Sequence, residues 1–181
     1  GNNFNYHLIP FKKAIKNNLK VIMPYYGVPI GQTNEEVAMA FNDYILSDLL
    51  RNELGYDGVI CSDWGIITGR HWGVGDLSIE ERYKKSLQAG IDQYGGENNP
   101  SYILNLIENN NVSEQRINES VTKILINKFE LGLFDNPYVD EDMIHKRVNT
   151  IENIKAGIEA QRRSIVLLEN DGVLPLKQET K

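Results

Sequence analysis

The sequence predicts an α/β fold in which helices cover a parallel sheet. Short apolar segments of strand character recur at intervals of roughly 30–40 residues, the length of one strand and the helix that follows it. Each of these segments precedes a longer one whose apolar residues recur at helical spacing. Because parallel strands need long, usually helical crossovers, this alternation favours a parallel sheet.

The first part of the chain begins with a predicted short helix at residues 7–18 and a strand at Lys20–Tyr25. Thr33 and Glu36 match a capping box, in which a hydroxyl and a carboxylate satisfy free N–H groups at a helix start. The helix expected from this box ends at Gly55, because glycine is common just beyond a helix C-terminus. Its apolar face has a spacing of four residues and consists of Val37, Phe41, Ile45 and Leu49.

The same order repeats twice. A strand is expected at residues 59–62, and a second capping box at Ser78 and Glu81 begins a helix that runs to Gly90. A third strand is expected at residues 91–94, followed by a helix that begins at Asn99-Pro100. A longer helix starts at Ser113, stops at Gly132 and has an apolar face formed by Ile117, Val121, Leu125 and Phe129.

The alternation stops near residues 131–142, where Pro137 and several acidic residues indicate a surface linker. Ile151, Ile154 and Ile158 then form one more helix face. An apolar strand is expected in RRSIVLLENDGVLPL, residues 162–176, with a turn at residues 170–172. We therefore expect a first domain at residues 1–135, and a linker, a helix and the first strand of a second domain at residues 136–181.

Composition excludes several classes of function. The chain has 181 residues, a formal charge of −6 and a pI near 5.1, so it lacks the basic patch that a nucleic-acid partner requires. No apolar run approaches the ~20 residues that span a bilayer, and no membrane partner is expected. The single cysteine, Cys61, excludes an internal disulfide. No Cys/His set has metal spacing and no phosphate-binding glycine motif is present, so neither a metal nor a cofactor is expected.

The stretch GVICSDWG, residues 58–65, places a carboxylate and a large aromatic ring where a strand should end. In parallel α/β folds, functional groups gather at the carboxyl ends of strands. An indole can stack on a sugar ring, and a carboxylate can attack an anomeric carbon. Two interpretations follow from these residues: Asp63 and Trp64 form a carbohydrate site, or Asp63 caps a loop and Trp64 fills a core edge. Arg70, His71 and Trp72 follow closely enough to rim the same pocket.

Five motifs in order resemble glycoside hydrolase family 3. The segment that resembles the family's nucleophile motif is GYDGVICSDWG, preceded by LSDLLRNELG. The other four motifs are HLIPFKKAIKNNLKVIMPYY, LQAGIDQYGG, INESVTKILINKFELGLFDNPYVD and EAQRRSIVLLENDGVLPL. This resemblance covers essentially the whole chain. It implies the C-terminal part of a (β/α)8-type barrel, about three βα units, in residues 1–135, and the start of an α/β sandwich domain after it.

The resemblance also implies roles for individual residues. Asp63 would be the nucleophile of a retaining glycosidase that acts at the non-reducing end of β-glucosides or related β-glycosides. Trp64 would form the aromatic wall of the sugar site, Tyr26 would hydrogen-bond the nucleophile, and Met23 would line the same strand end. The family often has Asn where this chain has Gly27, so the contacts of that amide are not expected here.

The resemblance implies that part of the enzyme lies outside this sequence. The family's acid/base residue usually comes from beyond the barrel. Glu97 and Glu169 are tempting substitutes here, but the family often has Lys at the position of Glu169, so a structural role is expected for it. We expect a fragment that is inactive alone and needs the remainder of the same enzyme. The alternative is a non-catalytic carbohydrate-binding or assembly module. The sequence does not choose between glucose and xylose, and it identifies no compartment.

Overall fold

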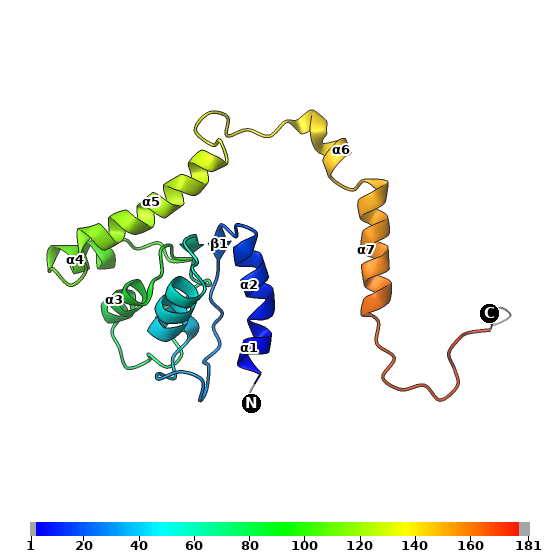
Figure 1. The fold of residues 1–181 in the computed structure, drawn as a ribbon, viewed down its shortest axis with the longest axis horizontal. Coiled ribbons are helices and arrows are strands. Elements are labelled where there is room, and N and C mark those ends of the chain that lie inside the picture. Colours follow the sequence, from blue (N-terminus) through cyan, green and yellow to red (C-terminus); the bar gives the residue numbers. More distant parts are fainter. Residues whose placement is uncertain (1–2, 178–181) are drawn as a thin grey trace. The chain divides into compact units, whose positions relative to one another are not determined.

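The computed structural model describes residues 3–177, which divide into two units between Asn136 and Pro137 (Figure 1). The elements of the first unit are α1 (Phe4–His7), α2 (Ile9–Lys16), β1 (Val21–Ile22), the 3-10 helix η1 (Met39–Phe41), the π-helix η2 (Tyr44–Glu53), β2 (Val59–Ile60), α3 (Ile79–Ala89), α4 (Ser101–Glu108) and α5 (Glu114–Glu130). The elements of the second unit are the 3-10 helix η3 (Glu141–Met143), α6 (Ile144–Arg147) and α7 (Ile151–Ser164).

The strands are parallel, as predicted, but much shorter than predicted. β1 pairs with β2, and Val21 lies opposite Val59. The segment predicted as a third strand, residues 91–94, joins β2 through an isolated parallel bridge between Cys61 and Gln93. Three chain segments thus lie side by side in the predicted order and direction, although the described residues contain little regular sheet.

One side chain explains why the pairing of β2 with the third segment is so short. The N–H of Ile60 donates to Oδ2 of Asp92 at 3.0 Å instead of to a backbone carbonyl. Regular pairing resumes two residues later, where the N–H of Ser62 donates to the carbonyl of Gln93 at 2.8 Å. A carboxylate therefore occupies one position of the hydrogen-bond ladder.

The capping box predicted at Thr33 and Glu36 is wrong. The Thr33 hydroxyl donates to a backbone carbonyl two residues ahead, and the regular helix starts only at Tyr44. The residue that satisfies the helix start is Asn42, whose Oδ1 accepts the N–H of Ile45 at 3.0 Å. Asn42 is completely buried, and its amide also donates to Thr33 Oγ1 at 3.0 Å. This buried amide fixes the helix start at η2.

Four other predicted helix signals are confirmed, whereas α4 begins at Ser101 with Pro100 at its N-cap, one residue later than the Asn99-Pro100 signal predicted. Ser78 and Glu81 form a complete capping box at the start of α3. The Ser113 hydroxyl accepts the N–H of Arg116 at the start of α5. Gly55 and Gly132 follow η2 and α5 with φ of +66° and +69°, values that glycine adopts readily. These signals succeed because they depend on neighbouring residues only.

The helices of the first unit pack around the strand segments and bury one apolar core. α3 packs against α4 and η2, and α5 packs against β2 (Figure 1). The largest side chains that are completely buried in the core belong to Phe41, Leu46, Ile60, Ile66, Ile67, Ile91 and Leu106. The core therefore holds both the strand that precedes Asp63 and the loop that follows it.

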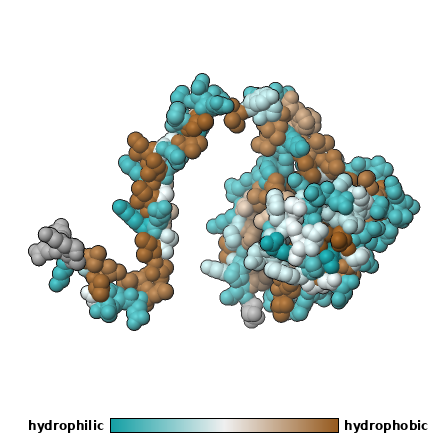
Figure 2. Space-filling model, turned by 180° about the vertical axis from the view of Figure 1, so that it is seen from behind, coloured by the Kyte–Doolittle hydropathy of each residue, from teal (hydrophilic) through white to brown (hydrophobic). Residues whose placement is uncertain are grey.

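The second unit exposes most of its apolar side chains. α7 forms where predicted, and the Thr150 hydroxyl accepts the N–H of Asn153 at its start. Its predicted apolar face is exposed, with Ile151 at 75% and Ile154 at 50% (Figure 2). The strand predicted after it does not form: residues 165–168 have no ladder partner among the described residues, and Leu168 is 92% exposed. A strand needs a neighbour for its backbone hydrogen bonds, which explains the difference.

Candidate active site

Asp63 lies just beyond the end of β2. The chain reaches it through Ser62, which is completely buried and whose hydroxyl accepts the N–H of Gly95 at 3.0 Å. The Asp63 side chain is half-buried, and its Oδ1 accepts the N–H of Trp64 at 2.7 Å. Within residues 3–177 its carboxylate forms no ion pair. The backbone thus orients this carboxylate and leaves it accessible.

The Trp64 indole lies against the backbone of a glycine pair. A Cβ added to Gly95 would lie 2.6 Å from Trp64 Cε3, and one added to Gly96 would lie 2.7 Å from Trp64 Cδ1. Only residues without a side chain permit this approach. Trp64 is nevertheless 57% exposed, which contradicts the interpretation that it fills a core edge. The glycine pair supports the ring and leaves much of it open to a ligand.

Tyr26 connects the end of the first strand segment to Asp63. Its hydroxyl lies 3.1 Å from the carbonyl of Trp64, to which it can donate. A hydrogen bond with the Asp63 carboxylate is the largest cause that raises the pKa of Tyr26 above its ordinary value, followed by desolvation, while Arg70 opposes the rise. The phenol has one proton, so Asp63 and the Trp64 carbonyl share it as alternative acceptors. Tyr26 is therefore a neutral donor beside Asp63.

The loop after Trp64 folds back over Tyr26. The guanidinium carbon of Arg70 lies 4.9 Å from the centre of the Tyr26 ring, and its Nη1 donates to the carbonyl of Trp64 at 3.2 Å. The Trp72 ring meets the Tyr26 ring edge-on, with 5.8 Å between their centres. The Nδ1 of His71 is buried and has no hydrogen-bond partner among the described residues. Arg70 and Trp72 thus belong to the same cluster as Tyr26.

Met23 lies on the same segment as Tyr26 but lines a different hollow. This apolar hollow lies between α1, α2, β1 and η2, and its lining includes Leu8, Met23, Tyr25, Leu46 and Leu50. Its predicted role in the sugar site stays a prediction.

The Glu97 carboxylate accepts hydrogen bonds from the loop that follows Trp64. Its Oε1 accepts the N–H groups of Ile67 and Thr68, both at 3.0 Å, and the Thr68 hydroxyl at 3.2 Å. Three donors on one oxygen indicate that Glu97 holds this loop in place. The other candidate, Glu169, lies in the second unit.

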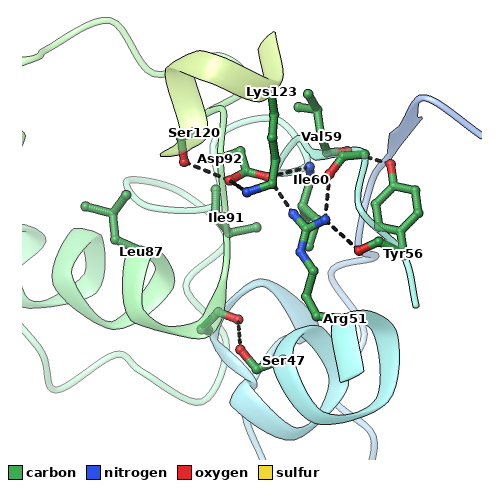
Figure 3. A network of polar contacts seen from close by, with 12 residues as sticks. Ser47, Arg51, Tyr56, Val59, Ile60, Leu87, Ile91, Asp92, Ser120 and Lys123 are labelled. Carbon is green, nitrogen blue, oxygen red and sulfur yellow. Dashed lines mark hydrogen bonds and ion pairs between the residues drawn. The ribbon is translucent and has the colours of Figure 1, made fainter. Parts of the chain in front are cut away.

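A buried ionic network surrounds Asp92 (Figure 3). The Asp92 side chain is completely buried, and its Oδ2 accepts Arg51 Nη2 at 2.6 Å. Its Oδ1 accepts the Ser120 hydroxyl at 2.7 Å and lies 3.4 Å from Arg116 Nη1. Lys123 approaches the same oxygen at 3.8 Å. The network joins η2, α5 and the third strand segment, beside the strand that precedes Asp63.

The sequence contained a signal for this network that our expectations did not use. Asp92 lies in an apolar strand segment, and a carboxylate there must be paired with a positive charge or a set of donors. Arg51 is the arginine of the LLRNELG motif, and it also donates to the carbonyls of Tyr56 and Gly58. The spacing of these residues does not reveal that they meet, since 41 positions separate Arg51 from Asp92.

Other types of site are not supported by the described residues. Burial raises the pKa of the Cys61 thiol, and the Asp63 charge adds to the rise, so the thiol stays protonated and is a poor nucleophile. Residues 3–177 contain no group of His, Cys, Asp and Glu side chains that could hold a metal ion. None of their helices combines the length and apolar character that crossing a bilayer requires.

Curated relatives match the chain over nearly its full length. A probable β-glucosidase C from Aspergillus flavus is 47% identical over 98% of this chain, and β-glucosidase C from Emericella nidulans is 46% identical over 97%. A periplasmic β-glucosidase/β-xylosidase from Dickeya chrysanthemi is 34% identical over 98%. The chain spans about 30% of the length of each relative.

Solved structures agree with this match. A β-glucosidase from Listeria innocua, in complex with isofagomine, superposes with a TM-score of 0.74 at 30% identity, over 94% of this chain and 24% of that one. A β-glucosidase involved in saponin metabolism from intestinal bacteria gives 0.74 at 29% identity, over 93% and 22%. The profile of the glycosyl hydrolase family 3 N-terminal domain matches residues 3–126. The chain therefore belongs to glycoside hydrolase family 3.

Proposed function

We propose that this chain supplies the nucleophile side of the active site of a β-glycosidase, with Asp63 as the nucleophile. The observation that carries the proposal is the arrangement around Asp63: a half-buried carboxylate beyond β2, beside the exposed Trp64 indole and near the Tyr26 hydroxyl, which lies 3.1 Å from the Trp64 carbonyl. Membership of glycoside hydrolase family 3 and the names of the β-glucosidase relatives support the same reaction.

The proposed reaction is a retaining double displacement. An Asp63 oxygen attacks the anomeric carbon, and the bond from that carbon to the leaving oxygen breaks. A general acid gives the leaving oxygen a proton, and a glycosyl ester remains on Asp63. Water, activated by the same group acting as a base, then displaces Asp63 and releases the sugar. Tyr26, as a neutral donor, orients the carboxylate for both steps.

The acid/base residue comes from polypeptide other than the described residues in this proposal. Retention needs a second carboxyl group about 5–5.5 Å from the nucleophile. Glu97 is held by three loop donors, and the family resemblance gives Glu169 a structural role, because the family often has Lys at that position. We therefore expect residues 1–181 alone to give no measurable turnover, and the assembled enzyme, meaning this chain together with the polypeptide that completes the site, to be active.

We place the chain in the larger fold as follows. Residues 1–135 form the C-terminal part of a (β/α)8-type barrel, about three βα units, and residues 136–181 begin an α/β sandwich domain. The three parallel strand segments and the division of the chain at residues 136–137 support this assignment. A β-glucoside or a related β-glycoside such as a β-xyloside is the proposed substrate, in agreement with the names of the relatives.

The test is covalent trapping with a 2-fluoro glycosyl fluoride. This reagent forms the glycosyl ester rapidly, but the fluorine slows its hydrolysis. We expect mass spectrometry of the assembled enzyme to find one added sugar on the peptide that contains Asp63. Binding of a glycoside without any label on this peptide would instead support a non-catalytic carbohydrate-binding module.

A further inference from the structure

Trp72 is an exposed aromatic residue on a firmly held backbone. Its carbonyl accepts the N–H of Ala38, which is completely buried, at 2.9 Å. The next residue, Gly73, has φ of +79°, and a Cβ there would lie 2.4 Å from the carbonyl oxygen of Glu36. The backbone at Trp72 is therefore packed tightly against residues 36–38. The position of its ring does not depend on a mobile loop.

The side chain of Trp72 remains 51% exposed in spite of this backbone. A large apolar ring is among the groups that gain most from burial, so a rigid fold that presents it to solvent indicates a binding surface. Chain flexibility does not explain the exposure, because the flanking backbone is fixed on both sides. The ring is thus already in place before any ligand arrives, which lowers the entropy lost on binding.

The Trp72 ring packs directly against the ring of Tyr26, which lies next to the candidate nucleophile. Its ring meets Tyr26 edge-on with 5.8 Å between the ring centres, and the Tyr26 hydroxyl lies 3.1 Å from the carbonyl of Trp64, the residue after Asp63. Trp64, by contrast, follows Asp63 directly and rests on its glycine pair. The cluster therefore contains one indole beside the nucleophile and a second indole beyond the Tyr26 ring. Two rings of a disaccharide or an aryl glycoside lie on opposite sides of the bond that breaks.

We propose that Trp72 forms the aromatic wall of an aglycone-binding subsite, the part of the site that holds the group attached to the anomeric carbon. This inference rests on the proposed function. The ligand is a ring with an apolar face, either a second pyranose or an aryl group, because an indole stacks on both. Arg70 contacts the Tyr26 ring and donates to the Trp64 carbonyl, so it belongs to the same cluster as the two tryptophans.

The test compares substrates that differ only in the aglycone. Trp72→Leu keeps an apolar side chain but removes the aromatic face, and Trp72→Phe keeps a smaller aromatic face. In the assembled enzyme, we expect Trp72→Leu to lower kcat/KM about tenfold for an aryl β-glucoside or a β-linked disaccharide. The loss of kcat/KM for methyl β-glucoside, which has no aglycone ring and reports only a shift of the Tyr26 cluster, should be much smaller, and Trp72→Phe should recover most of the difference.

The pattern of loss identifies the aglycone. A loss confined to the aryl glycoside assigns an aryl group to the subsite, and one confined to the disaccharide assigns a second sugar. An equal loss on methyl β-glucoside, or no loss on any substrate, would overturn the inference.

A second measurement separates this inference from the proposed function. A 2-fluoro glycosyl fluoride has no aglycone ring, so Trp72→Leu should still be labelled at Asp63, with a smaller loss of rate than it shows on the aryl β-glucoside. Normal labelling together with unchanged kcat/KM values would reject the role of Trp72 and retain that of Asp63. Failure to label the unmodified enzyme would reject both.

Discussion

Asp63 and Asp92 lie on neighbouring strand segments, yet their carboxylates differ in burial and in the partners that surround them. The Asp92 side chain is completely buried, and both its oxygens accept from Arg51, Ser120 or the Ile60 N–H. Asp63 is half-buried, forms no ion pair within residues 3–177, and accepts a backbone N–H from Trp64, whose carbonyl lies 3.1 Å from the Tyr26 hydroxyl.

This difference separates a structural carboxylate from one available for chemistry. A buried carboxylate surrounded by cations stabilises the fold only while every partner is present. A carboxylate that attacks an anomeric carbon must instead keep a free lone pair and reach the substrate. The identity of the residue therefore says little about its role, and the surroundings decide it.

The largest expected effect is the loss of activity in Asp63→Ala. We expect kcat in the assembled enzyme to fall about 10³-fold or more, because the covalent intermediate cannot form. The thermal unfolding midpoint should stay close to that of the unmodified enzyme, since the side chain takes part in no buried network. Turnover comparable to the unmodified enzyme would remove Asp63 from the mechanism.

For Asp92→Ala, in contrast to Asp63→Ala, we expect a large loss of stability. Removing this carboxylate leaves Arg51 and Arg116 without their buried partner, and the loss in free energy of unfolding should be about 3–5 kcal/mol. Denaturant unfolding of the assembled enzyme measures it. Asp76→Ala, at an exposed position, is the matched control and should change stability little. A similar small change for Asp92→Ala would contradict the structural role.

Tyr26→Phe tests how much the Tyr26 hydroxyl, a neutral donor, contributes to kcat. Hydrogen bonds to charged groups are stronger than neutral ones, so we expect kcat to fall about tenfold to a hundredfold. Because the pKa of Tyr26 is raised, its proton stays in place at neutral pH and up to at least its ordinary value near 10. The ratio of the two kcat values should thus be constant between pH 5 and about 8. A ratio that changes over this range would contradict a neutral donor.

The smallest expected effect concerns the support of the Trp64 indole. In Gly95→Ala the new Cβ would lie 2.6 Å from Trp64 Cε3 and 2.8 Å from the carbonyl oxygen of Ser62, so the ring and the backbone just before Asp63 must both move. We expect KM for a β-glucoside to rise about tenfold, because crowding a packed site displaces its side chains. The control is Gly75→Ala, where the nearest atom to the new Cβ is 3.9 Å away. Equal KM values in both variants would show that the glycine pair does not position the ring.

The fold could be predicted where the signal was local. Ser78 and Glu81 form the capping box that their spacing predicts, but Thr33 and Glu36, with the same spacing, do not. The difference comes from the buried amide of Asn42, which fixes a later helix start through contacts that span nine positions. The strand expected within residues 162–176 does not form for a related reason, because the hydrogen bonds of a strand require a partner strand.

The candidate site could be predicted in part. The rule that functional groups gather at the ends of parallel strands brought Tyr26, Asp63 and Trp64 together, and the structure places these three in one cluster. The support from Gly95 was not expected, because it depends on a close approach between segments 31 positions apart. Long-range proximity of this kind has no signature in a single sequence.

The carbonyl of Trp64 accepts from both Tyr26 and Arg70, and this has a consequence for genetics. Both bonds end on the main chain, which every amino acid provides. Alleles that replace the indole at codon 64 therefore keep these two bonds, and their phenotypes report the loss of the ring alone. Alleles at codons 26 and 70, in contrast, each remove one hydrogen bond to this carbonyl. An allele that changes both codons should therefore have a larger defect than either single change.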